Sequence, residues 1–305
     1  MPAAPYTARH LTAIITTHDS AAVLPACLQA LKEQNVAVIV VDNASSDDCV
    51  DIAESFAARV LVNKQNQGFG RAMTQGVQAA ETPLVLLVNP DLVLAEGAVA
   101  AFLVAVNRYP DAALFGPRII EDGGRIFFPN HSLLATFLKN DKRKEWKPSG
   151  DCCVPFLSGA CMLIRRDVML DLGGFDPFIF LFYEDDDLCR RISEAGHALI
   201  HVDRALVRHA RGGSSAPKAG RVFKARFHLA WSRLYVARKW GIEAPTFATL
   251  CIQYAKLAAA TLLGNAKRKE RHGGTIAGIK AFQNDVPALG YEGLPFEPEI
   301  PQPPH

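Results

Sequence analysis

The sequence lacks the features that mark membrane-spanning and nucleic-acid-binding proteins. No apolar run reaches the length of about 18 residues that a membrane-spanning helix needs. The net charge of the 305 residues is only +2, far below the basic excess of a typical nucleic-acid-binding domain. We therefore expect neither a membrane span nor a nucleic-acid partner.

The seven cysteines also lack an informative pattern, since no CxxC pair and no spacing typical of a metal site occurs. Cys152 and Cys153 are adjacent in sequence and cannot easily form a disulfide with each other. The N-terminus shows no signal peptide. An odd number of cysteines in such a chain predicts reduced thiols and a cytoplasmic location.

What the sequence does contain is an alternation of strand and helix patterns, with a globular composition of 49% hydrophobic and 21% charged residues. This alternation predicts an α/β fold, a mostly parallel sheet with helices on both faces. In the first half, we expect strands at 11–17, 36–41, 59–63, 84–88 and 112–115, with helices at 21–34, 47–58, 70–80 and 95–109.

The second half is less regular. Glu121–Gly124 is a turn sequence, so residues 118–127 are expected to form a hairpin. Segment 129–150 is long and polar, which is typical of a lid or a mobile loop. The other expected elements are strands at 156–165, 198–202 and 205–209, a short helix ending near 195, a flexible stretch at 211–215, helices at 221–240 and 247–263, and an extended tail at 295–305.

Polar residues follow four consecutive predicted strands. Ligands of parallel α/β sheets bind beyond the carboxyl ends of the strands, so these four segments are expected to converge on one site. The segments are Thr16–Asp19, Asp42–Asp47, Asn63–Arg71 and Asn89–Asp91.

Four consecutive acids, Glu184–Asp187, follow the apolar run 178–183. Ion pairs between residues i and i+4 stabilise helices, so Asp186 is expected to pair with Arg190, and Asp187 with Arg191.

Glu184 and Asp185 have no such partner, because Leu188 and Cys189 lie four residues after them. An acid at the border of an apolar segment can keep a raised pKa and act as a base. A purely structural role remains the alternative for both.

Asn89-Pro90-Asp91 follows the apolar strand at 84–88. Residues two apart in an extended segment point the same way, so Asn89 and Asp91 can face one ion or its water shell. Mg²⁺ and Mn²⁺ prefer such oxygen ligands. A simple turn is the alternative interpretation.

Six motifs occur in one order and together resemble family 2 glycosyltransferases of the GT-A fold, most closely the rhamnosyltransferase-like branch. The resemblance covers about residues 10–215 and implies transfer from a nucleotide-diphospho-sugar with inversion at the anomeric carbon. The motifs are Val40–Asp47, Gln67–Ala72, Val88–Asp91, Ser158–Met162, Gly173–Asp176 and Tyr183–Leu188.

The resemblance implies a nucleotide-sugar pocket at the strand ends. Asp42 would bind the uracil or thymine edge, Thr16 and His18 would line the base and ribose pocket, and Arg71 would lie near the base or diphosphate. Asn43 is assigned to the same pocket. The alternatives are that Asp42 and Asn43 cap a helix beginning near residue 47, and that Arg71 and His18 are ordinary polar residues.

The resemblance also implies the catalytic and metal residues. Asp91 would bind Mg²⁺ or Mn²⁺, and His209 would occupy a later metal- or diphosphate-binding position, with a plain polar role as its alternative. The family usually has Asp-x-Asp where this chain has Asn89 and Asp91, which lowers the charge of the site by one. Asp185 would be the general base, assisted by Glu184.

These expectations define a catalytic domain at 1–215, with a nucleotide-sugar half at about 10–116 and an acceptor half at 117–215. A C-terminal helical region and tail follow at 216–305.

The expected donor is dTDP-L-rhamnose or another dTDP- or UDP-sugar, and the expected acceptor is a glycan or a lipid-linked glycan of the cell surface. A sugar-nucleotide-binding protein without activity, and a nucleotidyltransferase, are the alternative functions. The latter would need a glycine-rich loop and a basic residue after the first strand, where Thr16–Asp19 stands.

The helix expected at 247–263 is apolar, and basic residues follow it at 267–271. One interpretation is that it packs on the catalytic domain. The other is peripheral contact with the anionic inner face of the cytoplasmic membrane. A second copy of the chain, forming a homodimer, is a further candidate partner.

Overall fold

A computed structural model describes residues 5–127, 132–134, 149–209 and 220–294. The chain divides into two compact units. The sheet unit comprises Met1–Phe175 and Asp185–Ala216, and the helical unit comprises Asp176–Glu184 and Pro217–His305. The stretch at 211–215, the tail at 295–305 and most of the predicted lid at 129–150 lie outside the described residues.

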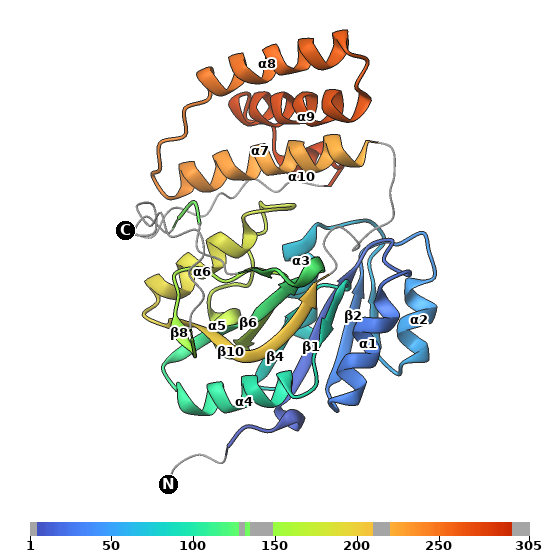
Figure 1. Cartoon of the computed structure of the whole chain (residues 1–305), viewed down its shortest axis with the longest axis vertical. Coiled ribbons are helices and arrows are strands. Elements are labelled where there is room, and N and C mark those ends of the chain that lie inside the picture. Colours follow the sequence, from blue (N-terminus) through green and yellow to red (C-terminus); the bar gives the residue numbers. More distant parts are fainter. Residues whose placement is uncertain (1–4, 128–131, 135–148, 210–219, 295–305) are drawn as a thin grey trace. The chain divides into compact units, whose positions relative to one another are not determined.

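The sheet unit is built on a ten-stranded sheet in the order β3-β2-β1-β4-β9-β6-β10-β5, with β7 beside β6 and β8 beside β10 (Figure 1). Strands β3, β2, β1 and β4 run parallel, as do β6 and β10. The strands are β1 Leu11–Thr17, β2 Ala37–Asp42, β3 Arg59–Val62, β4 Leu84–Val88, β5 Leu92–Leu94, β6 Ala112–Glu121, β7 Ile126–Phe127, β8 Cys152–Cys153, β9 Cys161–Arg165 and β10 Ala198–His209.

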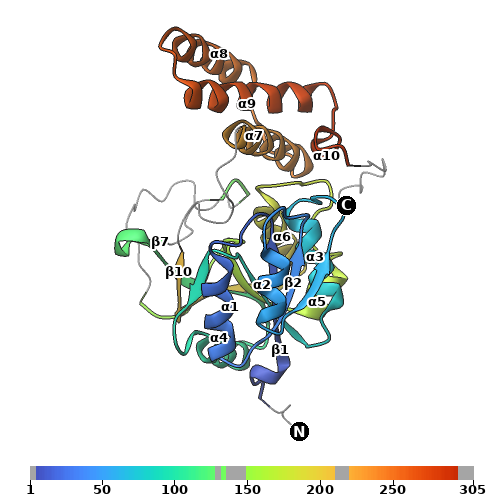
Figure 2. The same ribbon diagram turned by 90° about the vertical axis from the view of Figure 1, so that its right-hand side faces the viewer.

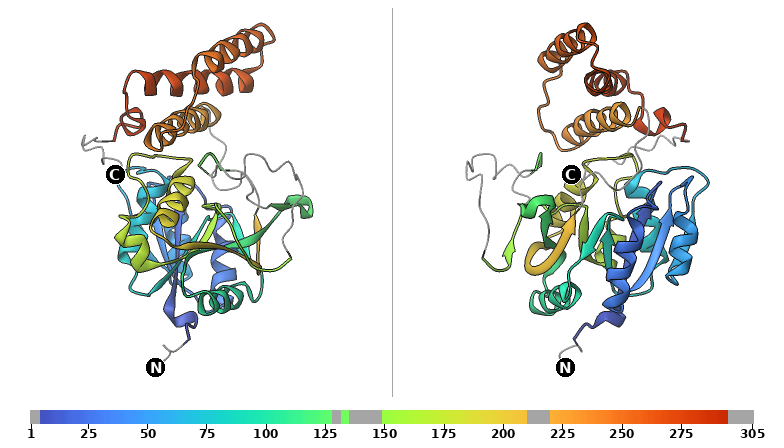
Figure 3. Two further views of the ribbon diagram at one scale, coloured as in Figure 1. Left: turned by 90° about the vertical axis from the view of Figure 1, so that its left-hand side faces the viewer. Right: turned by 45° about the vertical axis from the view of Figure 1, so that its right-hand side comes forward.

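Helices cover both faces of the sheet (Figure 3). Strands β1 and β4 are buried along their whole length, as expected of parallel strands that pack against helices on each side. Helices α1 Leu24–Glu33, α2 Cys49–Ser55 and α4 Ala98–Arg108 share one core with the sheet. Helices α3 Phe69–Ala79, α5 Arg166–Asp171 and α6 Glu184–Glu194 share the other. The predicted fold class is therefore confirmed.

The sheet departs from the predicted pattern after β4. The antiparallel strand β9 separates β4 from β6, and it begins at Cys161, not at 156. The two strands predicted at 198–202 and 205–209 are one strand, β10, in which the register with β6 shifts between Val202 and Leu206. Such an irregularity interrupts the side-chain alternation, which is why one strand resembled two. The hairpin at 118–127 is confirmed by the pairing of β6 with β7.

The helical unit contains α7 Arg221–Lys239, α8 Phe247–Leu262, α9 Ala266–Gln283 and α10 Ala288–Tyr291, with α9 lying between α7 and α8 (Figure 2). Two glycines bring the backbones of α7 and α9 together. A Cβ atom on Gly274 would lie 2.3 Å from the carbonyl oxygen of Phe223, and one on Gly278 would lie 2.3 Å from that of Phe227. The sequence pattern had predicted α7 and α8 but not α9.

Segment Asp176–Glu184 packs with these helices. Ser232 Oγ donates a hydrogen bond to the carbonyl oxygen of Leu181 (2.9 Å), and Phe180 stacks on His228 with ring centres 4.5 Å apart. The Asp176 carboxylate accepts a hydrogen bond from Tyr235 Oη (3.0 Å). Trp231 and Tyr235 of α7 belong to the apolar core of this unit.

Candidate active site

The carboxyl ends of the parallel strands meet along one edge of the sheet, as predicted. Thr17 at the end of β1 lies opposite Asp42 at the end of β2, and Asp42 lies opposite Val62 at the end of β3. Strand β4 is in register with β1 on the other side, since Val88 lies opposite Ile15.

Asp42 is held rigidly at this edge. Its side chain is almost wholly buried, with 1% of the residue exposed. Oδ1 accepts a hydrogen bond from Thr17 Oγ1 (2.9 Å), and Oδ2 accepts one from the backbone N–H of Ser45 (3.0 Å). These bonds run to β1 and to the loop after β2. Asp42 is therefore not the cap of α2, which begins at Cys49.

Asn43 connects the second strand end to the third. Its Oδ1 accepts hydrogen bonds from Asn63 Nδ2 (3.2 Å) and from the backbone N–H of Gln67 (2.8 Å). Its Nδ2 donates to Asn66 Oδ1 (2.8 Å) and to the carbonyl oxygen of Gly68 (3.1 Å). The sequence analysis assigned Asn43 to the nucleotide pocket without a specific contact. In the structure, its side chain joins the loop after β2 to the loop after β3 by hydrogen bonds.

A further set of hydrogen bonds, between Asp19 and Ser46, holds this edge and was not predicted from the sequence. The Oδ1 atom of Asp19 accepts hydrogen bonds from both the backbone N–H and the hydroxyl of Ser46, each 2.8 Å long. Asp19 and Ala44 have φ angles of 54° and 61°, a conformation that residues other than glycine rarely adopt. Left-handed residues of this kind are typical of functional loops. The only signal in the sequence was the density of Asp and Ser residues.

Thr16, His18 and Arg71, three of the predicted nucleotide-binding residues, differ in burial and in their contacts. Thr16 Oγ1 is buried and has no hydrogen-bond partner in the described part of the chain. The His18 side chain is 41% exposed, and its Nδ1 lies 3.0 Å from the carbonyl oxygen of Asn43. Arg71 is partly buried in the first turn of α3, three residues after Gly68.

The predicted metal residues come together across the sheet. His209 Nε2 lies 3.5 Å from Asp91 Oδ1, because the pairing of β10 with β5 sets His209 opposite Leu92. The Asp91 side chain is fully buried, and that of His209 is 15% exposed. Asn89 Oδ1 is also buried and accepts no hydrogen bond from any described residue.

These groups fit a divalent cation. Carboxylate, imidazole and amide oxygen are ligands that Mn²⁺ accepts, and the carboxylate and amide also suit Mg²⁺. Among the described residues, no cluster of three or more His, Cys, Asp or Glu side chains is placed to hold a metal. A cation at Asp91 and His209 would therefore need further oxygen ligands from a bound molecule or from water.

Asp185 is anchored by two backbone N–H groups. Its Oδ2 accepts a hydrogen bond from Gly159 (2.9 Å), and its Oδ1 accepts one from Asp186 (3.0 Å) in its own helix. Burial raises the pKa of Asp185, and the two N–H bonds oppose that rise. Glu184, the first residue of α6, is buried.

One short loop connects Asp185 to the Asn89–Asp91 segment. Gly159 donates its N–H to Asp185, and the next residue, Ala160, accepts a hydrogen bond from the backbone N–H of Asn89 (2.9 Å). The two residues come from the motif Ser158–Met162, which had matched the family pattern without an assigned role. The loop thus fixes the candidate base and the candidate metal segment to the same piece of backbone.

The remaining two acids of the run behave differently. The Asp187–Arg191 pair is confirmed at 2.8 Å, with the Asp187 side chain fully buried. The predicted Asp186–Arg190 pair is wrong, because Arg190 pairs with Glu194.

Asp186 instead accepts hydrogen bonds from the Ser132 hydroxyl and from the backbone N–H of Leu133 (3.1 Å). Helical spacing did not reveal this, since the bonding groups come from a distant segment. Burial and the neighbouring Asp185 raise the pKa of Asp186 to about 7.

Comparison with known proteins adds a family match. Residues 12–173, more than half of the chain, match the family model described as "Glycosyl transferase family 2". The chain is 28% identical over 247 residues to N-acetylglucosaminyl-diphospho-decaprenol L-rhamnosyltransferase of Mycobacterium tuberculosis, covering 68% of this chain and 80% of that protein. It is 26% identical over 245 residues to rhamnosyltransferase WbbL of Escherichia coli, covering 74% and 92%.

A solved structure shares the fold. The mannosyltransferase from Pyrobaculum calidifontis, in complex with GDP-Man and Mn²⁺, superimposes with a TM-score of 0.54 at 17% sequence identity. The match covers 90% of this chain and 87% of the mannosyltransferase. At this identity the likeness concerns the fold.

Proposed function

This chain belongs to glycosyl transferase family 2, and we propose that it transfers L-rhamnose from a dTDP- or UDP-sugar to a hydroxyl group of a glycan or lipid-linked acceptor. The observation that carries the proposal is the Gly159–Ala160 loop. It holds Asp185 through one N–H bond and the Asn89–Asp91 segment through the next carbonyl group. A base and a leaving-group site on one rigid frame are what a single displacement requires.

The proposed chemical step begins with the acceptor hydroxyl. Asp185 accepts its proton as the oxygen attacks the anomeric carbon, which contributes about 10²–10⁴ to the rate. The bond to the diphosphate breaks on the opposite side of the sugar, so the configuration inverts. No second carboxylate nucleophile is required, in contrast to retaining hydrolysis.

The leaving group accumulates negative charge as it departs. Asp91 and His209, with the amide oxygen of Asn89, would hold Mg²⁺ or Mn²⁺ at this point. Such an ion supplies electrostatic stabilisation of the diphosphate. The protein's own contribution is to keep these ligands buried and in place before the donor arrives.

The donor nucleotide is proposed to occupy the edge formed by β1, β2 and α3. Thr16 supplies a buried hydroxyl without a described partner, and Arg71 supplies a cation at the start of α3. His18 lines the open side. Asp42 and Asn43 already hold β1 and the neighbouring loops in position, so they would pre-organise the pocket.

The proposal is tested by a thermal-shift screen of dTDP- and UDP-sugars, each with and without Mn²⁺ or Mg²⁺. We expect one sugar nucleotide to raise Tm, and the metal to increase the rise, because both bind only the folded state. A matching transfer assay then uses glycan and lipid-linked acceptors. If no sugar nucleotide raises Tm and none is consumed, the proposed function is wrong.

We also propose that α8 contacts the membrane surface at which a lipid-linked acceptor would reside. No helix in the described ranges is long and apolar enough to cross a membrane. Helix α8 nevertheless turns an uncharged face outward while its opposite face contacts α9. The exposed residues on and just after α8 along this face are Phe247, Ala248, Cys251, Ile252, Ala255, Ala258, Ala259, Leu262 and Leu263.

Charge complementarity supports an anionic lipid surface as the occupant. Lys256 borders this apolar face, and Lys267, Arg268 and Lys269 are exposed in the first turn of α9. An apolar helix face flanked by cations is typical of interfacial binding. In flotation assays, we expect the protein to bind anionic vesicles at low salt and a Leu262→Ser/Leu263→Ser variant to bind weakly. An absence of wild-type binding would exclude this contact.

A further inference from the structure

The helical unit contains a cavity whose role the proposed reaction leaves unassigned. Its volume is about 330 Å³, and its walls come from α7, from the start of α8, from α9 and from the segment before α6. Polar and cationic groups concentrate on these walls. The polar and cationic lining residues include Tyr183, Arg226, Arg233, Thr249, Gln253 and Thr275.

The cavity carries positive charge and no acidic residue in its lining. Arg226 and Arg233 make no ion pair or hydrogen bond with any residue that the structure describes. They lie seven residues apart on α7, about 10 Å along one face of the helix, so their long side chains can converge on one anion. Arginine binds phosphate groups through paired N–H donors.

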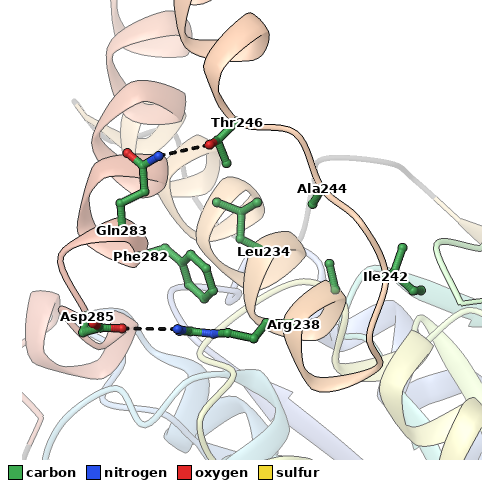
Figure 4. A pocket seen from close by; sticks show the side chains of 9 residues that line it. Leu234, Arg238, Ile242, Ala244, Thr246, Phe282, Gln283 and Asp285 are labelled. Carbon is green, nitrogen blue, oxygen red and sulfur yellow. Dashed lines mark hydrogen bonds and ion pairs between the residues drawn. The ribbon is translucent and has the colours of Figure 1, made fainter.

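A neighbouring cavity of the same volume provides a contrast (Figure 4). There Arg238 forms an ion pair with Asp285 (3.3 Å), and Gln283 donates a hydrogen bond to Thr246 (3.0 Å). Its arginine is thus neutralised by the protein itself. The cavity with Arg226 and Arg233 lacks such an acid in its lining, so an external anion would supply the missing charge.

The surroundings of the cavity are also cationic. His272 Nδ1 lies 2.7 Å from Oε1 of Gln253, a lining residue. The pKa of His272 is lowered by burial and then by a set of nearby cations. These are Lys256, Arg271, Arg268 and Arg226.

The backbone at one wall of this cavity has an uncommon conformation. Tyr183 lines the cavity and comes two residues before Asp185 in the sequence. Phe182 and Tyr183 have φ angles of 70° and 68°, which non-glycine residues adopt only when the surroundings enforce it. Segment 176–184 is held against α7 by the contacts of Phe180, Leu181 and Asp176, and this packing constrains the backbone of Phe182 and Tyr183.

We propose that this cavity binds the diphosphate group of a lipid-linked acceptor. The inference rests on the proposed function and adds the location and chemistry of the acceptor site. Arg226 and Arg233 neutralise the diphosphate through their N–H donors. The hydroxyl groups of Thr249 and Thr275 donate instead to the carbonyl oxygens of Pro245 and Arg271. Helix α8 borders the cavity through Thr249 and Gln253, while its apolar face suits the lipid chain.

The test measures binding of farnesyl diphosphate, inorganic pyrophosphate and farnesol by calorimetry. Saturating dTDP or UDP fills the donor pocket, and EDTA removes divalent metal, so only the proposed site remains for the probe. We expect farnesyl diphosphate to bind the wild-type protein more tightly than the other two probes. An Arg226→Gln/Arg233→Gln variant should bind it at least about tenfold more weakly, since charged hydrogen bonds are lost.

Two control variants separate charge at the cavity from charge in general. Arg238→Gln removes a cation from the same helix and should leave farnesyl diphosphate binding unchanged. Arg226→Lys keeps the charge and should recover part of the affinity lost in Arg226→Gln. Circular dichroism confirms that each variant is folded.

Three outcomes would overturn the inference. They are an absence of wild-type binding, equal binding by the double variant, and equal binding of pyrophosphate and farnesyl diphosphate, which excludes a lipid-linked ligand. Failure of the proposed function is a separate result, because it appears as an absence of sugar-nucleotide binding in the wild-type protein.

Discussion

His209 Nε2 lies 3.5 Å from Asp91 Oδ1, although Asp91 follows β4 and His209 ends β10, the last strand of the sheet. The pairing of β10 with the three-residue strand β5 creates this relationship, since His209 stands opposite Leu92. A buried carboxylate beside an imidazole is a pair that a divalent cation can join. Without the cation, the same pair is a weak ion pair only when the imidazole is protonated.

The first prediction concerns this pair. We expect Asp91→Asn and His209→Gln each to weaken Mn²⁺ binding at least about tenfold, because even the partners of metal ligands contribute that much. The measurement is a Mn²⁺ titration in the presence of dTDP or UDP, followed by electron paramagnetic resonance. His197→Gln is the matched control, since His197 comes just before β10 and lies at the opposite end of that strand from His209. Unchanged Mn²⁺ affinity in both ligand variants would refute the assignment.

The second prediction concerns the base. Asp185→Asn should lower the rate of transfer by about 10²–10⁴ while sugar-nucleotide binding persists. The amide oxygen can still accept a hydrogen bond from Gly159, so the helix start is preserved. Transfer kinetics and donor titration give the two readouts. Glu194→Gln, an acid on the same helix that pairs with Arg190, should remain active. Full transfer activity in Asp185→Asn would show that another group is the base.

The third prediction concerns the loop that positions Asp185. A Cβ atom at Gly159 would lie 3.2 Å from Asp185 Cβ, so Gly159→Ala must shift the carboxylate by a few tenths of an ångström. We expect kcat to fall about tenfold, because small displacements of a catalytic group are costly, while the donor KM changes little. Equal changes in kcat and donor KM would indicate a general disturbance of the fold.

The fourth prediction concerns pH. The pKa of Asp186 rises from 3.8 to about 7 in the folded protein, chiefly through burial. The folded state therefore holds this proton more tightly than the unfolded chain, and stability should decline as pH rises from about 4 to about 7. Asp186→Asn keeps an acceptor for Ser132 and Leu133 without the charge. Denaturant unfolding across this range should show a flatter pH profile for the variant. An identical profile would contradict the assignment.

The fifth prediction uses two adjacent glycines of α9. Replacing a mid-helix glycine by alanine normally stabilises a protein by about 0.5–1 kcal/mol. Gly273→Ala should follow this rule, because its Cβ would meet the Phe223 ring at 3.4 Å. Gly274→Ala should instead destabilise by about 1–3 kcal/mol, because its Cβ would collide with the Phe223 backbone. Chemical denaturation measures both, and equal effects would refute close backbone packing of α7 on α9.

Much of the fold was predictable because the parallel part of the sheet is buried on both faces. Strands β1 and β4 were located to the residue by their apolar runs. The edge at which the strand ends converge was also predictable, since parallel strands point their carboxyl ends the same way. Helix α9 escaped prediction because its glycines and basic residues hide the helical pattern.

The contacts of Glu184–Asp187 show which side-chain pairs a helical pattern can predict and which it cannot. The spacing that correctly paired Asp187 with Arg191 wrongly paired Asp186 with Arg190. Helical spacing tells which residues can meet on one helix, but Asp186 meets Ser132 and Leu133 from another part of the chain. Burial of that contact also decides the pKa of Asp186.

The sequence by itself determined the sheet edge and the Asp187–Arg191 pair, and it predicted the residues that we propose for nucleotide, metal and base. The tertiary structure alone decided which of them meet. It brought His209 to Asp91 through the β5–β10 pairing, and it fixed Asp185 and Asn89 to the two residues of the Gly159–Ala160 loop. Strand pairing and loop closure act between distant segments, so no local pattern of residues records them.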